Sequence, residues 1–227
     1  MYDVGNIAII GSGSWATAIA KIVVEHTHHI GWYFRRDETI EQFRKLGHNP
    51  TYLTSAHFDT SEIRLSSDIN RLVQDYDTLI FVTPSPYLKS ILKKVKHKLH
   101  EKFIVTAIKG IVPDENVVCT EYFRTTFGVP EDQLMVLGGP SHAEEVAKKD
   151  LTTITAACTE LSSAKVVQQL FSNSYFRVYT NTDVIGVELG AALKNVIAVG
   201  AGALHGLGYG DNAKAALMTR GLAEISR

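Results

Sequence analysis

The 227-residue chain has little cysteine and no excess of charge of either sign. Its two cysteines, Cys119 and Cys158, are far apart and fit neither a disulfide framework nor a zinc or redox motif, which indicates buried, reduced thiols and a cytoplasmic protein. The formal net charge is -1, so the composition argues against a protein that binds nucleic acid or an anionic membrane surface.

The sequence also gives no sign of a leader sequence, a membrane span or a metal site. Residues 1–5 do not resemble a signal peptide, and we expect no apolar stretch long enough to span a bilayer. His26, His28 and His29 crowd one segment, but no carboxylate or cysteine lies at a ligand spacing nearby, so we expect no metal site. A soluble enzyme or binding protein is the expected class.

The composition is that of a globular protein. Hydrophobic residues make up 45% of the chain and charged residues 21%. A chain of this length is long enough for one or two domains with a sizeable core.

The main motif is a glycine turn near the N-terminus. Residues 6–10 form an isoleucine-rich apolar run, and a stretch of small residues follows the turn. Gly11 permits a sharp turn, Gly13 leaves room for a pyrophosphate, and Ala16 replaces a third glycine where helix and strand pack closely. The free N–H groups of the helix would face the anion. The pattern predicts a dinucleotide-binding turn; the alternative is an ordinary strand-to-helix turn that needs glycines.

The second apolar stretch, residues 29–36, ends in two arginines. In a dinucleotide-binding fold, an acidic residue about 20 positions after the glycine turn usually binds the adenosine ribose. Here Arg35 and Arg36 occupy the position of that acidic residue, and Asp37 follows them. Guanidinium groups pair with a 2′-phosphate, whereas a carboxylate repels it. The pair favours NADP(H), with NAD(H) tolerated; the alternative is a solvated arginine pair that starts a helix.

Further apolar runs predict the rest of a sheet, at residues 62–65, 77–84, 103–108, 134–137, 152–157 and 175–179. Helical patterns are expected at residues 87–99 and 161–171. This alternation predicts an α/β fold, a Rossmann-like doubly wound, mostly parallel sheet. From Asp183 onward the chain is rich in small apolar residues, so we expect a first domain over residues 1–182 and the start of a helical one over residues 183–227.

Two polar features follow predicted strands at the edge where such sheets bind ligands. Lys109 comes directly after the strand at residues 103–108, and the alternative is a lysine that points into water. The turn at residues 138–143 precedes a helix and offers an N-cap with free backbone donors. Such a turn could bind a phosphate or a carbonyl oxygen; the alternative is a capped turn without a ligand.

Residues 186–202 have the composition of a tightly buried helix, interrupted by Lys194 and Asn195. Burial lowers the pKa of a lysine towards neutrality, which makes Lys194 a candidate general acid–base. The alternative is a lysine whose ammonium group reaches water at the helix edge. The glycine-rich turn that follows places Asp211 as the N-cap of a last helix.

Five motifs in this order resemble the bacterial type of NAD(P)-dependent glycerol-3-phosphate dehydrogenase, over essentially the whole chain. The motifs are Gly11-Ser-Gly-Ser-Trp15-Ala-Thr-Ala18, Ile108-Lys-Gly110, Gly139-Pro-Ser-His-Ala-Glu-Glu-Val146, Glu188-Leu-Gly-Ala-Ala-Leu-Lys-Asn-Val196 and Gly206-Leu-Gly-Tyr-Gly-Asp-Asn-Ala-Lys-Ala-Ala-Leu217. The last two are highly specific. The resemblance implies hydride transfer between NAD(P)H and dihydroxyacetone phosphate, which gives sn-glycerol 3-phosphate for phospholipid synthesis.

The resemblance also implies roles for particular residues. Lys194 would donate and accept the proton, and Lys109 would contact both substrate and cofactor. Gly139 and Ser141 would line the substrate site, together with the two lysines. The implied cofactor contacts are Ser14, Trp15, Arg35, Arg36, Tyr52, Lys109 and Ala143, beside the glycines Gly11 and Gly13.

The chain departs from the family pattern at its C-terminus. Family members continue into a larger helical domain with further groups for the substrate phosphate, whereas this sequence stops at Arg227. We therefore expect an exposed apolar surface over residues 184–222, which favours self-association, such as a homodimer, or disorder of this part. Two alternatives stay open: an NAD(P)-binding fragment without catalysis, and a dehydrogenase for a hydroxy acid or ketopantoate.

Overall fold

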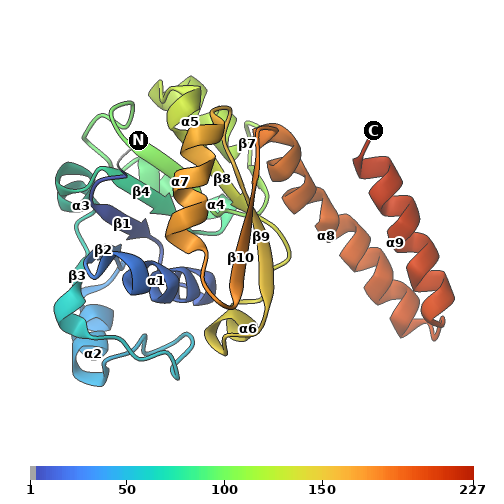
Figure 1. The fold of residues 1–227 in the computed structure, drawn as a ribbon, viewed down its shortest axis with the longest axis horizontal. Helices are drawn as coiled ribbons and strands as arrows, with labels where there is room; N and C mark the ends of the chain where they lie inside the picture. The colour runs from blue at the N-terminus through green and yellow to red at the C-terminus, as the bar shows by residue number, and fades with distance from the viewer. Residues whose placement is uncertain (1–3) are drawn as a thin grey trace.

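The computed structural model describes residues 4–227, and within them eight strands form one sheet (Figure 1). The strands are β1 (Ile7–Ile10), β2 (Ile30–Tyr33), β3 (Ile63–Ser66), β4 (Thr78–Phe81), β5 (Phe103–Thr106), β8 (Leu134–Gly138), β9 (Thr152–Ala157) and β10 (Phe176–Asn181). A separate antiparallel ribbon pairs β6 (Ile111–Val112) with β7 (Val117–Val118).

The strand order is β10-β9-β8-β5-β4-β1-β2-β3. The six strands from β3 to β8 are parallel and follow the order of dinucleotide-binding sheets, in which ligands bind where the order reverses, between β1 and β4. β9 runs antiparallel to β8, and β10 is parallel to β9. The predicted doubly wound, mostly parallel sheet is confirmed.

Helices cover both faces of this sheet. Their bounds are α1 (Ser14–Thr27), α2 (Asp37–Leu46), α3 (Ile69–Asp75), α4 (Ser85–Leu92), α5 (Cys119–Phe127), α6 (Ala143–Ala147) and α7 (Leu161–Phe171). One core cluster joins α1, α2, α6 and α7 to one face, and a second joins α3, α4 and α5 to the other. Side chains of a strand alternate between the faces, so Ile7 and Ile9 enter the first cluster and Ala8 and Ile10 the second. Both faces are thus apolar, as the unbroken hydrophobic runs indicate.

The expected helix over residues 87–99 is too long, since α4 ends at Leu92. The backbone beyond it bonds instead to the side chain of Asn70, which donates to the carbonyl oxygen of Lys94 at 3.0 Å and accepts from the N–H of Lys96 at 2.7 Å. These bonds take the groups that another helical turn would use. A residue distant in sequence therefore sets where this helix ends.

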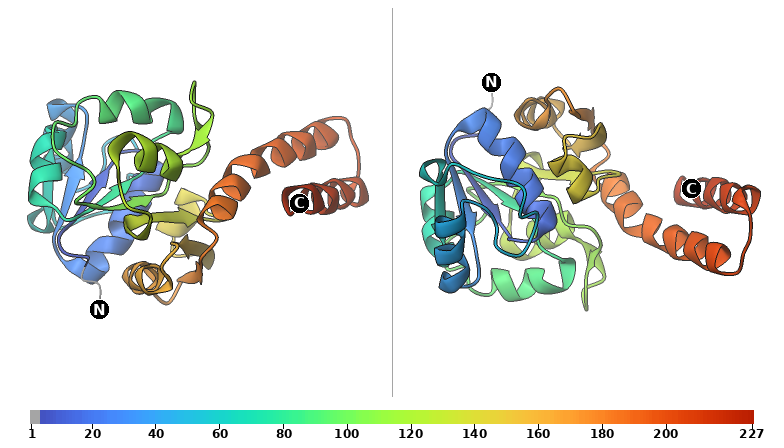
Figure 2. Two further views of the ribbon diagram at one scale, coloured as in Figure 1. Left: turned by 90° about the horizontal axis from the view of Figure 1, so that it is seen from above. Right: turned by 90° about the horizontal axis from the view of Figure 1, so that it is seen from below.

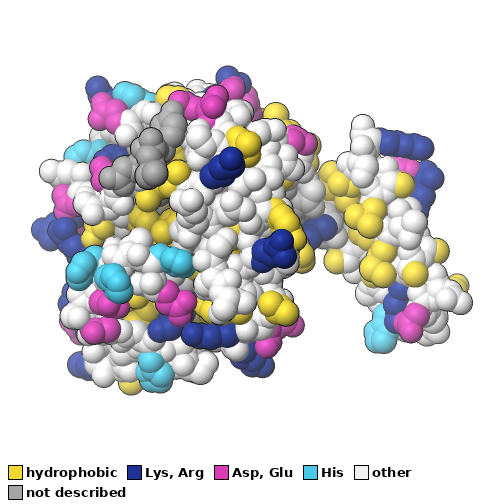
Figure 3. Space-filling model, in the orientation of Figure 1, with side chains coloured by type: hydrophobic (Ala, Val, Ile, Leu, Met, Phe, Trp, Pro, Cys, Tyr) yellow, Lys and Arg dark blue, Asp and Glu magenta, His cyan; other side chains and the backbone are white. Residues whose placement is uncertain are grey.

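Two helices extend away from the sheet domain as a hairpin, α8 (Val184–Gly206) and α9 (Asp211–Ile225) (Figures 1 and 2). The helix α9 begins after Gly210, so the expected N-cap at Asp211 is off by one residue. Hydrophobic side chains gather on this hairpin in Figure 3, and Val199 is 74% exposed. The prediction of a tightly buried helix is therefore wrong for α8, while the expected exposed apolar surface is present.

The length of α8 also corrects the expectation that no stretch could span a bilayer. Its 23 residues are long and apolar enough to do so by length and composition. The core helices of soluble proteins can have the same length and composition. Glu188 and Lys194 lie within the helix, and charged groups are costly inside a bilayer.

Candidate active site

The glycine turn after β1 is held in place by backbone geometry and one buried hydrogen bond. Gly11 has φ +136°, and a Cβ there would overlap the carbonyl oxygen of Val82, so no other residue fits without strain. The indole Nε1 of Trp32 donates to the carbonyl oxygen of Gly11 at 2.6 Å. Gly13 is the N-cap of α1 and offers no capping side chain, and the space beside its Cα is open. The first N–H groups of a helix have no partners within it, so those of α1 are suited to an anion beside Gly13.

A loop over residues 47–53 is tied to this turn by Asn49, which sequence reasoning missed. The buried amide of Asn49 donates to the carbonyl oxygen of Ser12 at 3.0 Å and to Oγ1 of Thr17 at 2.9 Å. Its Oδ1 accepts the N–H groups of Thr51 at 3.1 Å and Tyr52 at 3.2 Å. These four bonds hold Tyr52 over the glycine turn. The sequence signal was an asparagine in a turn-rich segment, which favours such side-chain-to-backbone bonds.

A pocket of about 490 Å³ opens at this end of the sheet. Five residues predicted for the cofactor line it: Gly11, Gly13, Arg35, Arg36 and Tyr52. Thr83, at the end of β4, lines it as well. Within residues 4–227 the buried Oγ1 of Thr83 has no hydrogen-bond partner, so it is a polar group directed at a ligand site.

The arginine pair is the strongest charge in this pocket. Arg35 and Arg36 are exposed, and neither forms an ion pair with any residue that the structure describes. Asp37, the first carboxylate after the strand, accepts a hydrogen bond from the hydroxyl of Ser67 and lines a different pocket. A phosphate at this corner would therefore meet guanidinium groups and no carboxylate, which fits the 2′-phosphate of NADP(H).

The second group of predicted residues meets around Lys109, just after β5. Its Nζ donates to the carbonyl oxygen of Ser141 at 3.2 Å and to Oγ of Ser141 at 3.3 Å. Ser141 Oγ in turn donates to the carbonyl oxygen of Gly139 at 3.4 Å. The ammonium of Lys109 also lies 5.6 Å from the centre of the Trp15 ring. Trp15 is the second residue of α1, directly after the glycine turn. Trp15 thus connects the two groups of residues.

The turn before α6 differs from the expected capped turn. The N-cap is His142, with no side-chain cap bond, and Ser141 faces Lys109 instead. Gly139 has φ +146°, and a Cβ there would lie 3.1 Å from the Cα of Ile154 in β9. Ala143 begins α6 and is buried in the core cluster shared with α1. Ser14 is half-buried as the first residue of α1.

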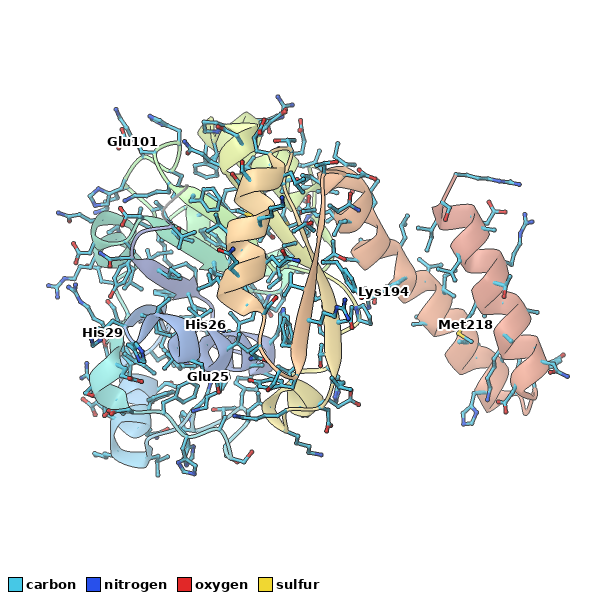
Figure 4. All side chains as sticks on the ribbon, in the orientation of Figure 1. Glu25, His26, His29, Glu101, Lys194 and Met218 are labelled. Atoms are coloured by element: carbon cyan, nitrogen blue, oxygen red, sulfur yellow. The ribbon has the colours of Figure 1, made fainter. Side chains whose placement is uncertain are left out.

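Lys194 lies on α8 and is exposed (Figure 4). Its Nζ donates to Oδ1 of the neighbouring Asn195 at 2.9 Å. Burial lowers the pKa of Lys109, and the positive charge of Lys194 lowers that pKa further. The charge of Lys194 thus acts on Lys109, although 85 residues separate the two lysines in the sequence.

Glu188 is a polar residue of this region that sequence reasoning did not select. It is 3% exposed and is the one buried side chain of α8, all of whose residues the structure describes. Its carboxylate accepts the N–H of Thr120 at 3.2 Å and also the hydroxyl of Thr120. Burial raises the pKa of Glu188 from 4.5 to about 7, although the bonds from Thr120 oppose this shift.

The raised pKa predicts a pH dependence of stability. Between pH 4.5 and about 7 the folded chain keeps a proton on Glu188 that the unfolded chain releases, so the free energy of unfolding falls as pH rises through this window. The size of this effect is about 3 kcal/mol. Glu188→Gln has no such proton, so it should lack this contribution to the pH dependence. Denaturation curves at pH 4.5 and pH 8 give the change in the free energy of unfolding for the variant and for the unchanged protein, and the two changes should differ by this amount. Equal pH dependence of the two proteins would contradict the assignment.

Family models match most of the chain. The description of the first is NAD-dependent glycerol-3-phosphate dehydrogenase N-terminus, at residues 6–164. The second describes the C-terminus of the same enzyme and matches residues 183–227. The first match ends at residue 164, and the second begins at Asp183.

Relatives and solved structures agree with these matches. A glycerol-3-phosphate dehydrogenase [NAD(P)+] of Latilactobacillus sakei is 47% identical over 98% of this chain, and one of Enterococcus faecalis is also 47% identical over 98%. The crystal structure of glycerol-3-phosphate dehydrogenase from Coxiella burnetii superposes with a TM-score of 0.86 at 29% identity, covering 98% of this chain and 68% of that one.

The chain spans 66% of the length of both bacterial relatives. Over that length the glycine turn, the lysine after β5 and the motif around Lys194 all lie in the matched regions. With the family models covering most of its residues, the chain belongs to the NAD-dependent glycerol-3-phosphate dehydrogenase family.

Proposed function

We propose that the protein interconverts dihydroxyacetone phosphate and sn-glycerol 3-phosphate with NADP(H), with NAD(H) as a tolerated alternative, and that the product supplies phospholipid synthesis. The observation that supports this most is the hydrogen-bonded group of Lys109 and Ser141 at the edge of the sheet where the parallel strands end, with the charge of Lys194 acting on it. The names of the bacterial relatives agree with it and give no support to a hydroxy-acid or ketopantoate dehydrogenase.

The residues present fit a dinucleotide. The open space beside Gly13 and the free N–H groups of α1 suit a pyrophosphate, and Arg35 and Arg36 suit the 2′-phosphate. Tyr52 and the hydroxyl of Thr83 complete the pocket. In this proposal Ser14, Trp15, Lys109 and Ala143 contact the remainder of the cofactor. When bound, the nicotinamide supplies the hydride in one direction and accepts it in the other.

The two lysines divide the remaining work. Charge develops on the ketone oxygen of the substrate as it is reduced, and the ammonium of Lys194 donates the proton that neutralises it. The same amine takes the proton back in the reverse direction. Lys109, held by Ser141, places a second positive charge that attracts the substrate phosphate. In this proposal Gly139 and Ser141 line the substrate site.

Several coarser features belong to the same proposal. Residues 1–182 would form the dinucleotide-binding domain and residues 183–227 the start of the helical substrate domain, in a cytoplasmic protein that uses a small-molecule substrate. The exposed apolar face of α8 and α9 would be covered by the part of the fold that the longer relatives have, or by a second copy in a homodimer.

The test is oxidation of NADPH and of NADH with dihydroxyacetone phosphate, measured at 340 nm, for residues 1–227 and for a full-length version. We expect turnover by the full-length version, with NADPH preferred. Turnover by the long form alone would mean that residues 1–227 bind the cofactor without catalysis. Turnover with ketopantoate and none with the triose phosphate would overturn the proposal.

A further inference from the structure

The helix that carries Lys194 contacts the sheet domain near its first turns. Beyond them α8 leaves the domain, and its other side chains are exposed or partly exposed (Figures 1 and 4). A helix is stiff over this length, so the contacts at its start decide where Lys194 lies.

Two contacts fix the first turns of α8. Val187 lies over Gly138 at the end of β8, so closely that a Cβ on Gly138 would come within 2.9 Å of Cγ1 of Val187. The next residue, Glu188, is buried and accepts both the N–H and the hydroxyl of Thr120. The valine contact is apolar and tolerates sliding, whereas the hydrogen bonds require one position.

The carboxylate of Glu188 also serves the helix α5, on which Thr120 lies. The N-cap of α5 is Val118, which has no side-chain acceptor, so the first N–H groups of that helix need another partner. Glu188 supplies it from α8. Within residues 4–227 no cation pairs with Glu188, and the titratable group that faces it is the thiol of Cys119, neutral because burial raises its pKa to about 12.

The start of α5 lies next to Lys109. The segment Lys109–Gly110 leads into β6, and β7 returns antiparallel to it, with Ile111 paired to Val118. This ribbon brings Cys119 back to Gly110, where its Sγ lies 3.9 Å from the carbonyl oxygen. An anchor at the start of α5 is thus an anchor beside Lys109.

We propose that Glu188 is a positioning residue: its carboxylate fixes α8 to the base of the β6–β7 ribbon and thereby holds Lys194 beside Lys109. This inference rests on the proposed function for its catalytic consequence. Lys194 lies six residues beyond Glu188, about 9 Å further along the helix axis. A change in the tilt of α8 at Glu188 would move Lys194 relative to Lys109, and misplacement of about 1 Å costs about 100-fold in rate.

The experiment compares three variants of the full-length protein, namely Glu188→Ala, Glu188→Gln and Glu121→Ala. Glutamine keeps an acceptor for the N–H of Thr120 and a donor for its hydroxyl, so it should preserve the anchor. Glu121 lies in the first turn of the same α5 and pairs with Arg124, away from α8, so it is the matched control. We expect kcat to fall about 10-fold to 100-fold in Glu188→Ala, and to stay within about threefold in the other two. The Kd for NADPH should change less than about twofold in all of them.

A second readout needs no turnover. The rate at which acetic anhydride acylates Lys109, followed by peptide mass spectrometry against pH, reports its pKa, which the charge of Lys194 lowers. In Glu188→Ala the midpoint should move to higher pH, and in Glu188→Gln it should not. If Glu188→Ala does not fold, Thr120→Val, which removes the hydroxyl partner, should show the same direction of change in both readouts.

Either of two results would overturn the inference: an unchanged kcat and unchanged Lys109 profile in a folded Glu188→Ala, or a loss of kcat in Glu188→Gln as large as in Glu188→Ala. Absence of turnover in the unsubstituted full-length protein is a different failure. It would end the proposed function, while the acylation profile of Lys109 would still decide whether Glu188 positions α8.

Discussion

Replacing Lys194 with alanine should lower the turnover of the full-length enzyme by about 10³-fold, the size expected when a general acid is lost. The Kd for NADPH should stay within about twofold, because the cofactor pocket lies at the glycine turn and none of its lining residues comes from α8. Stopped-flow reduction of dihydroxyacetone phosphate and fluorescence titration with NADPH measure the two quantities separately.

Two further variants separate proton transfer from charge. Lys194→Arg keeps a positive charge beside Lys109 but does not release its proton, so its turnover should be nearly as low as that of the alanine variant. Lys165→Ala removes an exposed lysine from α7 and should leave turnover unchanged. Near-normal rates in Lys194→Ala would remove Lys194 from the mechanism.

Arg35→Asp should reverse the coenzyme preference. Each hydrogen bond to a charged group contributes about 1.5–3 kcal/mol, and the new carboxylate would repel the 2′-phosphate, so the ratio of kcat/KM for NADPH to that for NADH should fall about 100-fold. The carboxylate would also accept hydrogen bonds from the ribose of NADH, as acidic residues at this corner do in NAD-binding sheets. Steady-state rates with both coenzymes at saturating dihydroxyacetone phosphate measure the ratio.

The control for Arg35 is Arg44→Asp. Arg44 is exposed on α2 and lines the neighbouring pocket with Asp37, so the same change of charge is made outside the cofactor pocket. Its coenzyme ratio should remain within about twofold of normal. An unchanged ratio in Arg35→Asp would show that the arginine pair does not recognise the 2′-phosphate.

Local patterns were sufficient for much of the fold. The apolar runs identified all eight strands of the main sheet, and a strand that is buried on both faces, such as β1, is continuously hydrophobic. The glycine turn was equally readable, since Gly11 and Gly13 have backbone requirements that few other residues meet. Helix ends were less readable: α4 stops where Asn70 captures its backbone, and nothing within residues 87–99 signals that.

The candidate site was also predictable only in part. The sequence by itself determined which residues have suitable chemistry: two lysines, two arginines and the glycine turns that follow strands. Only the tertiary structure decided that Asn49 holds the loop over the glycine turn, that Thr83 enters the pocket, and that Glu188 anchors α8. Asn49 is 37 positions from Ser12 in the sequence, and Glu188 is 68 positions from Thr120. No periodicity within one segment encodes such a pairing, because it depends on how the segments pack against each other.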